Sequence, residues 1–279
     1  MKENKSKISN GLFYTLLSLL SVAFLSPIFI VLMNSFKGRF FIDKLPFKFP
    51  NSETYVKFEN YLTGIEKTQF FSAFKYSIFI TIGSVAAIVF FTSMTAWYII
   101  RVKSAITKVL YFLFAFSMIV PFQMVMFTMS MVANRAGLDN PVGIIVIYLG
   151  FGSGLSVFMF AGFVKSIPLE IEEAAEIDGC SPIQTYFRVV FPILKPTAIT
   201  VAILNAMWIW NDYLLPYLTI GNDYKTIPIA VQSLKGNYGS IDMGAMMAVL
   251  VLAMLPIIVF YFICQKHIIK GVVAGAVKG

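Results

Sequence analysis

The sequence predicts an all-α polytopic membrane protein with six transmembrane helices. Of its 279 residues, 58% are hydrophobic and only 13% are charged, and the mean hydropathy is +0.79. A chain this apolar does not suit an ordinary soluble domain. It contains six apolar runs, each long enough to cross about 30 Å of hydrocarbon as a helix. The runs cover about residues 12–33, 71–100, 109–132, 142–164, 197–220 and 243–264, and we expect one transmembrane domain over residues 1–279.

The first apolar run follows a short basic segment and therefore imitates a signal peptide. It is too long for a typical signal-peptide core and it contains Pro27, so we expect it to be a retained transmembrane helix. The polar segment that follows, as far as Gln69, is typical of an external loop, and so is the segment 222–242.

A long polar interruption separates the fourth run from the fifth, at residues 166–196, and holds five of the fourteen acidic residues. Its helix-starting and helix-ending residues predict two short helices joined by a turn. Pro168 or Ser166 begins the first helix, and Asp178-Gly179 ends it. Ser181 begins the second helix and Pro192 ends it. We therefore expect a helical hairpin between the two spans.

The first hairpin helix has the composition of a docking surface. Ala174 and Ala175 leave a shallow notch, and acidic residues lie on both sides of it. Gly179 allows a sharp turn or a close approach of the backbone. A solvated acidic helix is the simpler alternative, because Glu and Ala are common helix residues. The notch favours a protein partner at this helix.

The hairpin resembles the EAA loop of ABC-transporter permeases. The matching positions are Glu173-Ala174-Ala175, Asp178-Gly179, Phe187 and Phe191-Pro192, while Cys180 replaces the usual Ala. The resemblance implies that this helix couples transport to a cytoplasmic ATPase, with Glu173 in an ion pair with the ATPase and Asp178 stabilising the turn. It also places the hairpin in the cytoplasm, and with six spans both termini lie there too.

Other motifs resemble the carbohydrate-uptake branch of these permeases, which includes maltose and glycerol-phosphate types. They are Asn34-Ser35-Phe36-Lys37, Trp210-Asn211-Asp212-Tyr213, Pro216, Pro256, Lys270-Gly271, Gly275 and Lys278-Gly279. The resemblance implies a bacterial inner-membrane importer. Its other parts would be a second permease from a different chain, two ATPase subunits and an external binding protein that delivers a di- or oligosaccharide.

The fifth run contains residues suited to a sugar pathway. Asn205, Trp208, Asn211 and Asp212 follow one another at spacings of three, three and one, so they share one side of a helix. An aromatic ring suits the C–H faces of a sugar, while amides and carboxylates bond its hydroxyls. The alternative is that these groups hold helices together or form an interfacial aromatic belt. Gln123 in the third run has the same two interpretations.

The sequence also limits the chemistry of this chain. It has no Gly-Lys dipeptide and hence no phosphate-binding Walker A loop, so ATP and Mg²⁺ must bind to partner ATPase subunits. Cys180, Cys264 and His267 have no metal-ligand spacing, and we expect no metal site, no cofactor and no catalytic residue. The net charge of +8 comes from residues near the ends of the apolar runs, which indicates contact with membrane lipid and not with nucleic acid.

Two other classes fit less well. An ion-coupled secondary transporter would place acids or His in the middle of its spans, and apart from Asp212 these runs have almost none. An intramembrane hydrolase would need a nucleophile beside a base, but Ser153 and His267 fall near opposite membrane surfaces. An ABC permease for glycerol phosphate or another polar solute stays open as the closest alternative.

Overall fold

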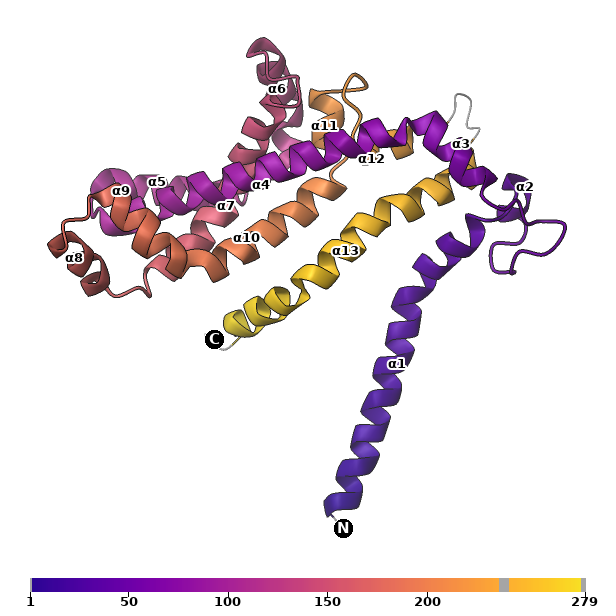
Figure 1. Ribbon diagram of the computed structural model, residues 1–279, viewed down its shortest axis with the longest axis horizontal. Coiled ribbons are helices and arrows are strands. Elements are labelled where there is room, and N and C mark those ends of the chain that lie inside the picture. The colour runs from indigo at the N-terminus through magenta and orange to yellow at the C-terminus, as the bar shows by residue number, and fades with distance from the viewer. Residues whose placement is uncertain (1, 236–240, 277–279) are drawn as a thin grey trace. The chain divides into compact units, whose positions relative to one another are not determined.

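A computed structural model describes residues 2–235 and 241–276, and the regular elements in these ranges are helices (Figure 1). The first seven are α1 Lys2–Asn34, α2 Arg39–Ile42, α3 Glu59–Thr68, α4 Phe70–Arg101, α5 Ala105–Ser117, α6 Phe122–Arg135 and α7 Gly143–Val164. The others are α8 Leu169–Ile177, α9 Pro182–Thr185, the π-helix η1 Tyr186–Val190, α10 Phe191–Asn211, α11 Leu214–Thr219, α12 Ile227–Gln232 and α13 Met243–Ala276. The Lys278-Gly279 motif lies outside the described residues, as do the side chains of His267 and Lys270.

Among the described residues, five helical segments are long and apolar enough to cross a membrane, and a bent pair brings the number to six if it counts as one span. The five are Phe13–Asn34, Phe70–Arg101, Gly143–Val164, Pro182–Asn211 and Met243–Lys266. The predicted all-α membrane class is therefore confirmed. The last helix continues past the predicted end of its span, to Ala276.

The third predicted span, 109–132, is not one straight helix. It consists of α5 and α6, whose axes differ by 108°. Pro121 lies at the break in an extended conformation, with φ −68° and ψ 140°. Proline has no N–H and disfavours helical geometry in the residue before it, so α5 ends at Ser117 and a new helix begins at Phe122.

The helix that contains most of the fifth predicted span, 197–220, has other bounds. Helical structure is continuous from Pro182 to Asn211, and Asp212 has an extended ψ of 126° that ends it. Pro192 therefore does not stop the second hairpin helix. The π-helical turn η1 precedes Pro192, and its wider backbone spacing accommodates a ring that would otherwise clash with the carbonyl four residues earlier.

Contacts divide the chain into two units, of which the first comprises Met1–Phe70 and Ala230–Pro256. In this unit the loop after α1 is tied to α3, since the amide of Asn60 donates to the carbonyls of Ser35 and Lys37, both at 2.8 Å. Gly64 of α3 approaches Val249 of α13 so closely that a Cβ atom there would lie 2.7 Å from the valine side chain. The expected single domain stays a prediction.

The second unit comprises Phe71–Ile229 and Ile257–Gly279, and its core lies between α4, α7 and α10. Fully buried apolar residues from these three helices include Ile88, Phe160 and Leu194. Small residues of α7 allow close packing: a Cβ atom on Gly154 would lie 2.5 Å from Ser117 Oγ of α5. This core carries the candidate site at its two ends.

Candidate functional site

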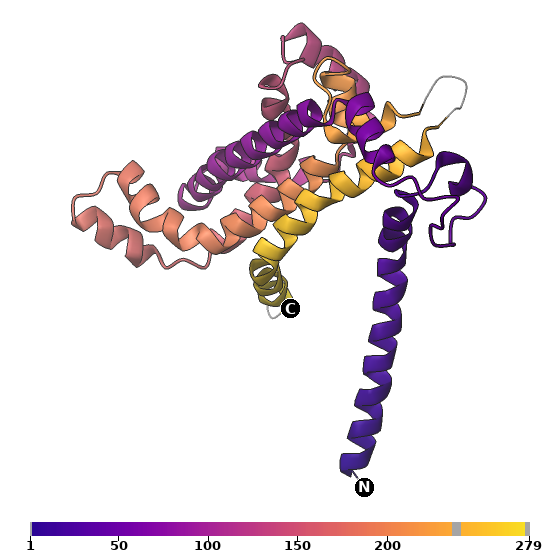
Figure 2. The ribbon, with the colours of Figure 1, turned by 45° about the vertical axis from the view of Figure 1, so that its right-hand side comes forward.

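The polar hairpin lies at one end of the second unit (Figures 1 and 2), where Glu172 of α8 is bonded to Arg101 in the last turn of α4. We call this the hairpin end. Helix α8 begins after Pro168, ends at Ile177, and is followed by Gly179 with φ +83°. The N–H of Cys180 donates to the carbonyl of Ala175 at 2.9 Å and closes the helix. These bounds agree closely with the start and end that the sequence predicts for this helix.

A capping box starts the second arm of the hairpin. The N–H of Ser181 donates to Gln184 Oε1 at 2.9 Å, and the N–H of Gln184 donates to Ser181 Oγ at 3.4 Å. Together with Pro182 at the first helical position, this exchange fixes where α9 begins. The turn between α8 and α9 is therefore determined locally, by Gly179 and by this cap.

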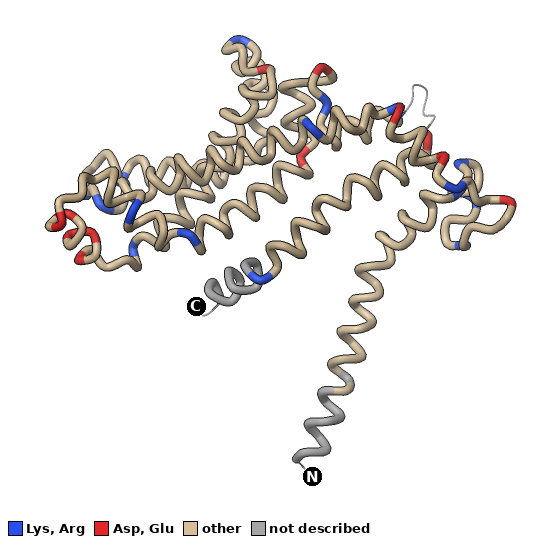
Figure 3. Tube along the Cα trace, viewed as in Figure 1, with Lys and Arg blue, Asp and Glu red and all other residues tan. Residues whose placement is uncertain are grey.

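Helix α8 has two different faces. Glu172 and Ala175, three residues apart, are buried against the rest of the unit. Glu173 and Ala174 are exposed on the other side, and so is Ile177, with 87% of its surface exposed. Ala174 is exposed and Ala175 is buried, so of the two alanines only Ala174 lies on the exposed face, and the notch stays a prediction. The exposed face is acidic, and Figure 3 shows the acids of α8 gathered at this end.

Glu172 is held by two side chains of α4. Its Oε1 accepts from Arg101 Nε at 2.8 Å and from Arg101 Nη2 at 2.6 Å, and its Oε2 accepts from Trp97 Nε1 at 2.9 Å. Arg101 Nη2 also donates to the carbonyl of Ile167 at 3.0 Å. We call Glu172, Arg101 and Trp97 the Glu172 clamp. It fixes α8 to the end of α4, because a buried carboxylate needs all of these donors.

Asn205 is the most buried of the predicted pathway residues, at 5% exposure. Its Nδ2 donates to Ser156 Oγ of α7 at 3.2 Å and to the carbonyl of Val201 at 2.9 Å. Gly152 of α7 leaves the space that its side chain occupies, since a Cβ atom there would lie 2.8 Å from Asn205 Oδ1. These contacts are those of a residue that holds two helices together.

The other predicted residues of α10 lie around its C-terminal end. Trp208 is 40% exposed and meets the ring of Tyr148 edge-on, with the ring centroids 5.4 Å apart. Asn211 is exposed, and its Nδ2 donates to the carbonyl of Met207 at 2.7 Å. Asp212 is half-buried and accepts from Tyr148 OH at 3.1 Å. We call Tyr148 and Asp212 the far-end pair.

Asp212 also begins the next helix. Its Oδ1 accepts from the backbone N–H of Leu214 at 3.0 Å and from that of Leu215 at 3.4 Å. Within the described ranges the two ion pairs are Lys67–Asp242 and Arg101–Glu172, so the carboxylate of Asp212 has neutral donors only.

Gln123 lies apart from this group. It is exposed in the first turn of α6, a helix that packs against α11, where Ser130 Oγ donates to the carbonyl of Leu218 at 2.6 Å. The structure thus brings Asn205, Trp208, Asn211 and Asp212 together along α10 and leaves Gln123 on a separate helix. No cluster of three metal-ligating side chains occurs among the residues that the structure describes.

Two parts of the site were not predicted from the sequence. The Glu172 clamp joins residues 71 positions apart, and Tyr148 is 64 positions from Asp212. Arg101 was visible only as the basic end of a span, and Tyr148 as one aromatic residue in an apolar run. A Trp and an Arg one turn apart at a helix end are the one signal that favours an acidic partner.

The helices, the polar hairpin and the half-buried polar group of α10 define the class of multi-pass membrane transport proteins. Within that class, the chain belongs to the family of binding-protein-dependent transport system inner membrane components, whose profile matches residues 80–273.

Relatives and solved structures agree with this family. The chain is 38% identical to the probable starch degradation products transport system permease protein AmyC of Thermoanaerobacterium thermosulfurigenes, over 93% of each chain. It is 33% identical to the multiple sugar-binding transport system permease protein MsmG of Streptococcus mutans, over 99% of this chain and all of the relative. Its fold matches a chain of a bacterial ABC transporter involved in alginate import, with a TM-score of 0.78, 21% identity, and coverage of 94% of this chain and 97% of the other.

Proposed function

We propose that this chain is a membrane-spanning permease subunit of an ATP-driven ABC importer and translocates a di- or oligosaccharide into the cytoplasm by alternating access. The names of the relatives support the cargo class, since the proteins of Thermoanaerobacterium and Streptococcus are named for starch degradation products and for multiple sugars. Glycerol phosphate or another polar solute is the alternative cargo.

The division of α8 into a clamped face and an exposed acidic face is the observation that carries this proposal. Glu173 and Ala174 on the exposed face, with Asp178 and Gly179 at its end, form the surface that docks on a cytoplasmic ATPase. Glu173 pairs with a basic residue of that partner, and Ala175 supports the surface from its buried position. The partner ATPases bind ATP and Mg²⁺.

The Glu172 clamp gives the movement of the ATPase a route into the membrane. A force on the exposed face of α8 reaches the end of α4 through the bonds between Glu172 and Arg101. It reaches α10 through the continuous helix that begins at Pro182. Displacement of the hairpin therefore tilts two spans together, and this is the structural requirement of alternating access.

The end of α10 is the part of this chain that faces the solute pathway. Trp208 offers a partly exposed ring for the apolar face of a sugar, and Asn211 and Asp212 offer polar groups for its hydroxyls. Asn205 holds α10 to α7 and acts on the pathway only through that contact. Gln123 serves the same pathway from α6.

The remaining features of the importer follow from this assignment. The hairpin and both termini lie in the cytoplasm of a bacterial cell, and the second permease is a different chain. An external binding protein delivers the sugar, an arrangement supported by a fold-related structure that is titled as an alginate transporter with a pentasaccharide-bound periplasmic protein. Membrane lipid surrounds the spans.

Uptake measurements test both halves of the proposal. Cells with and without the gene receive radiolabelled mono-, di- and oligosaccharides and glycerol phosphates, and we expect uptake of one sugar class to require the gene. Glu173→Arg is then compared with Glu170→Arg, a change of another exposed acid on the same helix. We expect Glu173→Arg to abolish that uptake and Glu170→Arg to leave most of it. Equal uptake in the two variants would remove Glu173 from the docking surface.

A further inference from the structure

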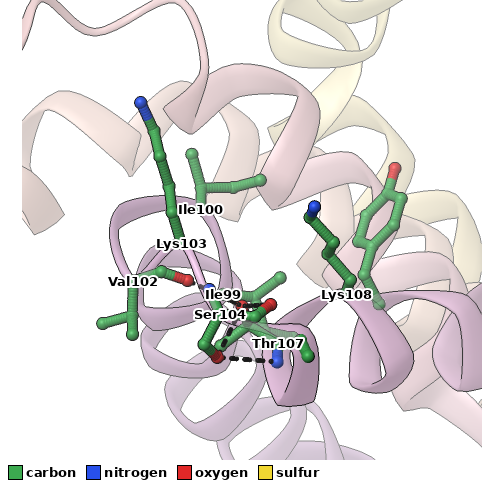
Figure 4. A pocket seen from close by; sticks show the side chains of 9 residues that line it. Ile99, Ile100, Val102, Lys103, Ser104, Thr107 and Lys108 are labelled. Atoms are coloured by element: carbon green, nitrogen blue, oxygen red, sulfur yellow. Dashed lines mark hydrogen bonds between the residues drawn. The ribbon is translucent and has the colours of Figure 1, made fainter.

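A pocket of about 500 Å³ lies at the hairpin end, in the turn that joins α4 to α5 (Figure 4). The last turn of α4 contributes Ile99 and Ile100, and the turn contributes Val102, Lys103 and Ser104. The first turns of α5 complete it. None of the residues assigned to the Glu172 clamp or to the exposed face of α8 lines this pocket, so it is separate from the coupling surface.

The pocket is positively charged and has no acidic lining residue. Lys103 and Lys108 lie on either side of it and extend toward the same side, with Ile100 between them (Figure 4). Lys165 adds a third cation nearby, with its Nζ 5.2 Å from the ring centroid of Tyr111, which also lines the pocket. The nearest arginine in sequence, Arg101, is already bonded to Glu172. The positive charge of this pocket is therefore available to a ligand.

The walls of the pocket are apolar, and its place in the chain puts it at a membrane boundary. The apolar span of α4 ends at Arg101, and α5 begins the next apolar segment at Ala105. The hydroxyls of Ser104 and Thr107 are used in the capping box of α5. A ligand would therefore meet lysine ammonium groups at the rim and the side chains of Ile99 and Val102 below them.

We propose that this pocket binds one anionic phospholipid, with its phosphate between Lys103 and Lys108 and an acyl chain along the apolar wall. A phospholipid has the two properties that the pocket matches, negative charge at the level where a span ends and hydrocarbon below it. The positive dipole end of α5 adds to the attraction of the lysines. A free anion would use the rim alone and leave the apolar wall in contact with water.

Binding of a defined lipid tests the proposal. The full chain, purified with the subunits that accompany it, is titrated with phosphatidylglycerol or with phosphatidylcholine of the same acyl chains, and bound lipid is counted by native mass spectrometry. We expect the protein to retain phosphatidylglycerol and not phosphatidylcholine. Each change of Lys103 or Lys108 to Gln weakens binding about fivefold, which corresponds to about 1 kcal/mol for a basic residue near an anionic surface.

A matched double variant distinguishes the effect of the pocket lysines from the effect of losing any two positive charges. Arg188→Gln with Lys195→Gln removes the same two charges from exposed positions of η1 and α10, and we expect it to retain the lipid. Ala105→Trp fills the pocket while it keeps both lysines, and we expect it to lose the lipid. Equal lipid binding by the double variant Arg188→Gln with Lys195→Gln and by the double variant Lys103→Gln with Lys108→Gln, or full binding by Ala105→Trp, would overturn the proposal.

Two further outcomes would assign the pocket to a different ligand. Displacement of phosphatidylglycerol by an equal concentration of glycerol phosphate would show that the headgroup alone binds, and the site would be one for a soluble anion. Loss of the accompanying subunits in the Lys103 and Lys108 variants, with bound lipid unchanged, would assign the rim to an acidic segment of a protein partner. Either result would contradict a lipid site.

Discussion

The two ends of the second unit use a carboxylate in different ways. At the hairpin end, Glu172 is buried and bonded to the guanidinium of Arg101 and to the indole of Trp97. At the end of α10, Asp212 is half-buried and, among the described residues, accepts from neutral donors, which are the hydroxyl of Tyr148 and backbone amides. The first arrangement neutralises a charge to fix two elements together. The second holds the carboxylate with hydrogen bonds from uncharged groups.

The largest effect should come from breaking the Glu172 clamp. Arg101→Gln leaves a buried carboxylate without its cation, and we expect the free energy of unfolding to fall by ~3–5 kcal/mol. Glu172→Gln with Arg101→Gln should lose less, because no charge is left unpaired. Thermal unfolding of the detergent-solubilised variants measures both. Glu173→Gln, a change of the neighbouring exposed acid, is the control and should stay within about 0.5 kcal/mol of the wild type.

A double variant that is no more stable than Arg101→Gln would show that Glu172 and Arg101 do not act as a pair. Glu172 would then not be a carboxylate that is neutralised by an arginine, and the two ends would not differ in this respect. The hairpin would be held by the packing of Ala175 and its neighbours alone.

The far-end pair should give the next largest effect. Tyr148→Phe removes one donor from a carboxylate that has no cation, and we expect a loss of about 1.5–3 kcal/mol, the range for a hydrogen bond to a charged group. The same unfolding measurement applies, with Tyr98→Phe at an exposed position of α4 as the control. A loss as large as that of Arg101→Gln would mean that the bond from Tyr148 stabilises Asp212 as strongly as Arg101 stabilises Glu172.

The turn of the hairpin should have a smaller effect on stability and a clear effect on coupling. Gly179 has φ +83° and open space around it, so a side chain there meets backbone strain and no clash. Gly179→Val should cost about 1–2 kcal/mol and reduce uptake per ATP hydrolysed without preventing membrane insertion. Gly179→Asn is the control, because Asn tolerates this conformation. Normal coupling in the valine variant would remove the turn from the docking surface.

The smallest effect belongs to the ion pair of the first unit, where Lys67 Nζ lies 2.6 Å from Asp242 Oδ2. Burial alone would raise the pKa of Asp242, but the hydrogen bond from Lys67, the amide of Ala245 and the charges of Lys67 and Arg39 hold the pKa below its usual value. The pair therefore contributes stability above the unfolded pKa of about 3.9, and loses it as the pH falls through the lower folded pKa.

Because Lys67 is half-exposed, the contribution of this pair should be only about 0.2–1 kcal/mol. Asp242→Asn should remove the difference in thermal stability between pH 6 and pH 3 that is due to this group. An unchanged pH profile in that variant would show that Asp242 has the same pKa in the folded and unfolded states. This half-exposed ion pair should therefore contribute less to stability than the buried pair of Arg101 and Glu172.

The sequence predicted the elements that depend on local rules. The bounds of α8 follow from Pro168 and Gly179, and the start of α9 follows from Ser181 and Pro182, because caps and turns are made by neighbours in the chain. The apolar spans were also recognised, although the helices of the third and the fifth have other bounds than predicted. Their membrane class depends on composition and length alone.

The sequence did not predict features that join distant residues. The clamp between Arg101 and Glu172 and the bond between Tyr148 and Asp212 depend on how α4, α7, α8 and α10 pack. The effects of Pro121 and Pro192 on their helices also differed from the prediction. Pro121 lies at a break between two helices, while Pro192 lies in a continuous helix directly after a π-helical turn.

That π-helical turn determines how far the hairpin is rotated about the helix axis relative to α10. Tyr186–Val190 carries one residue more than a regular α-helix of the same rise would need. Each residue of an α-helix advances the chain by about 100° around the axis, so the extra residue rotates α9 and the elements before it by that amount relative to α10. The direction in which the acidic face of α8 points therefore depends on the extra residue of this turn as well as on side-chain contacts.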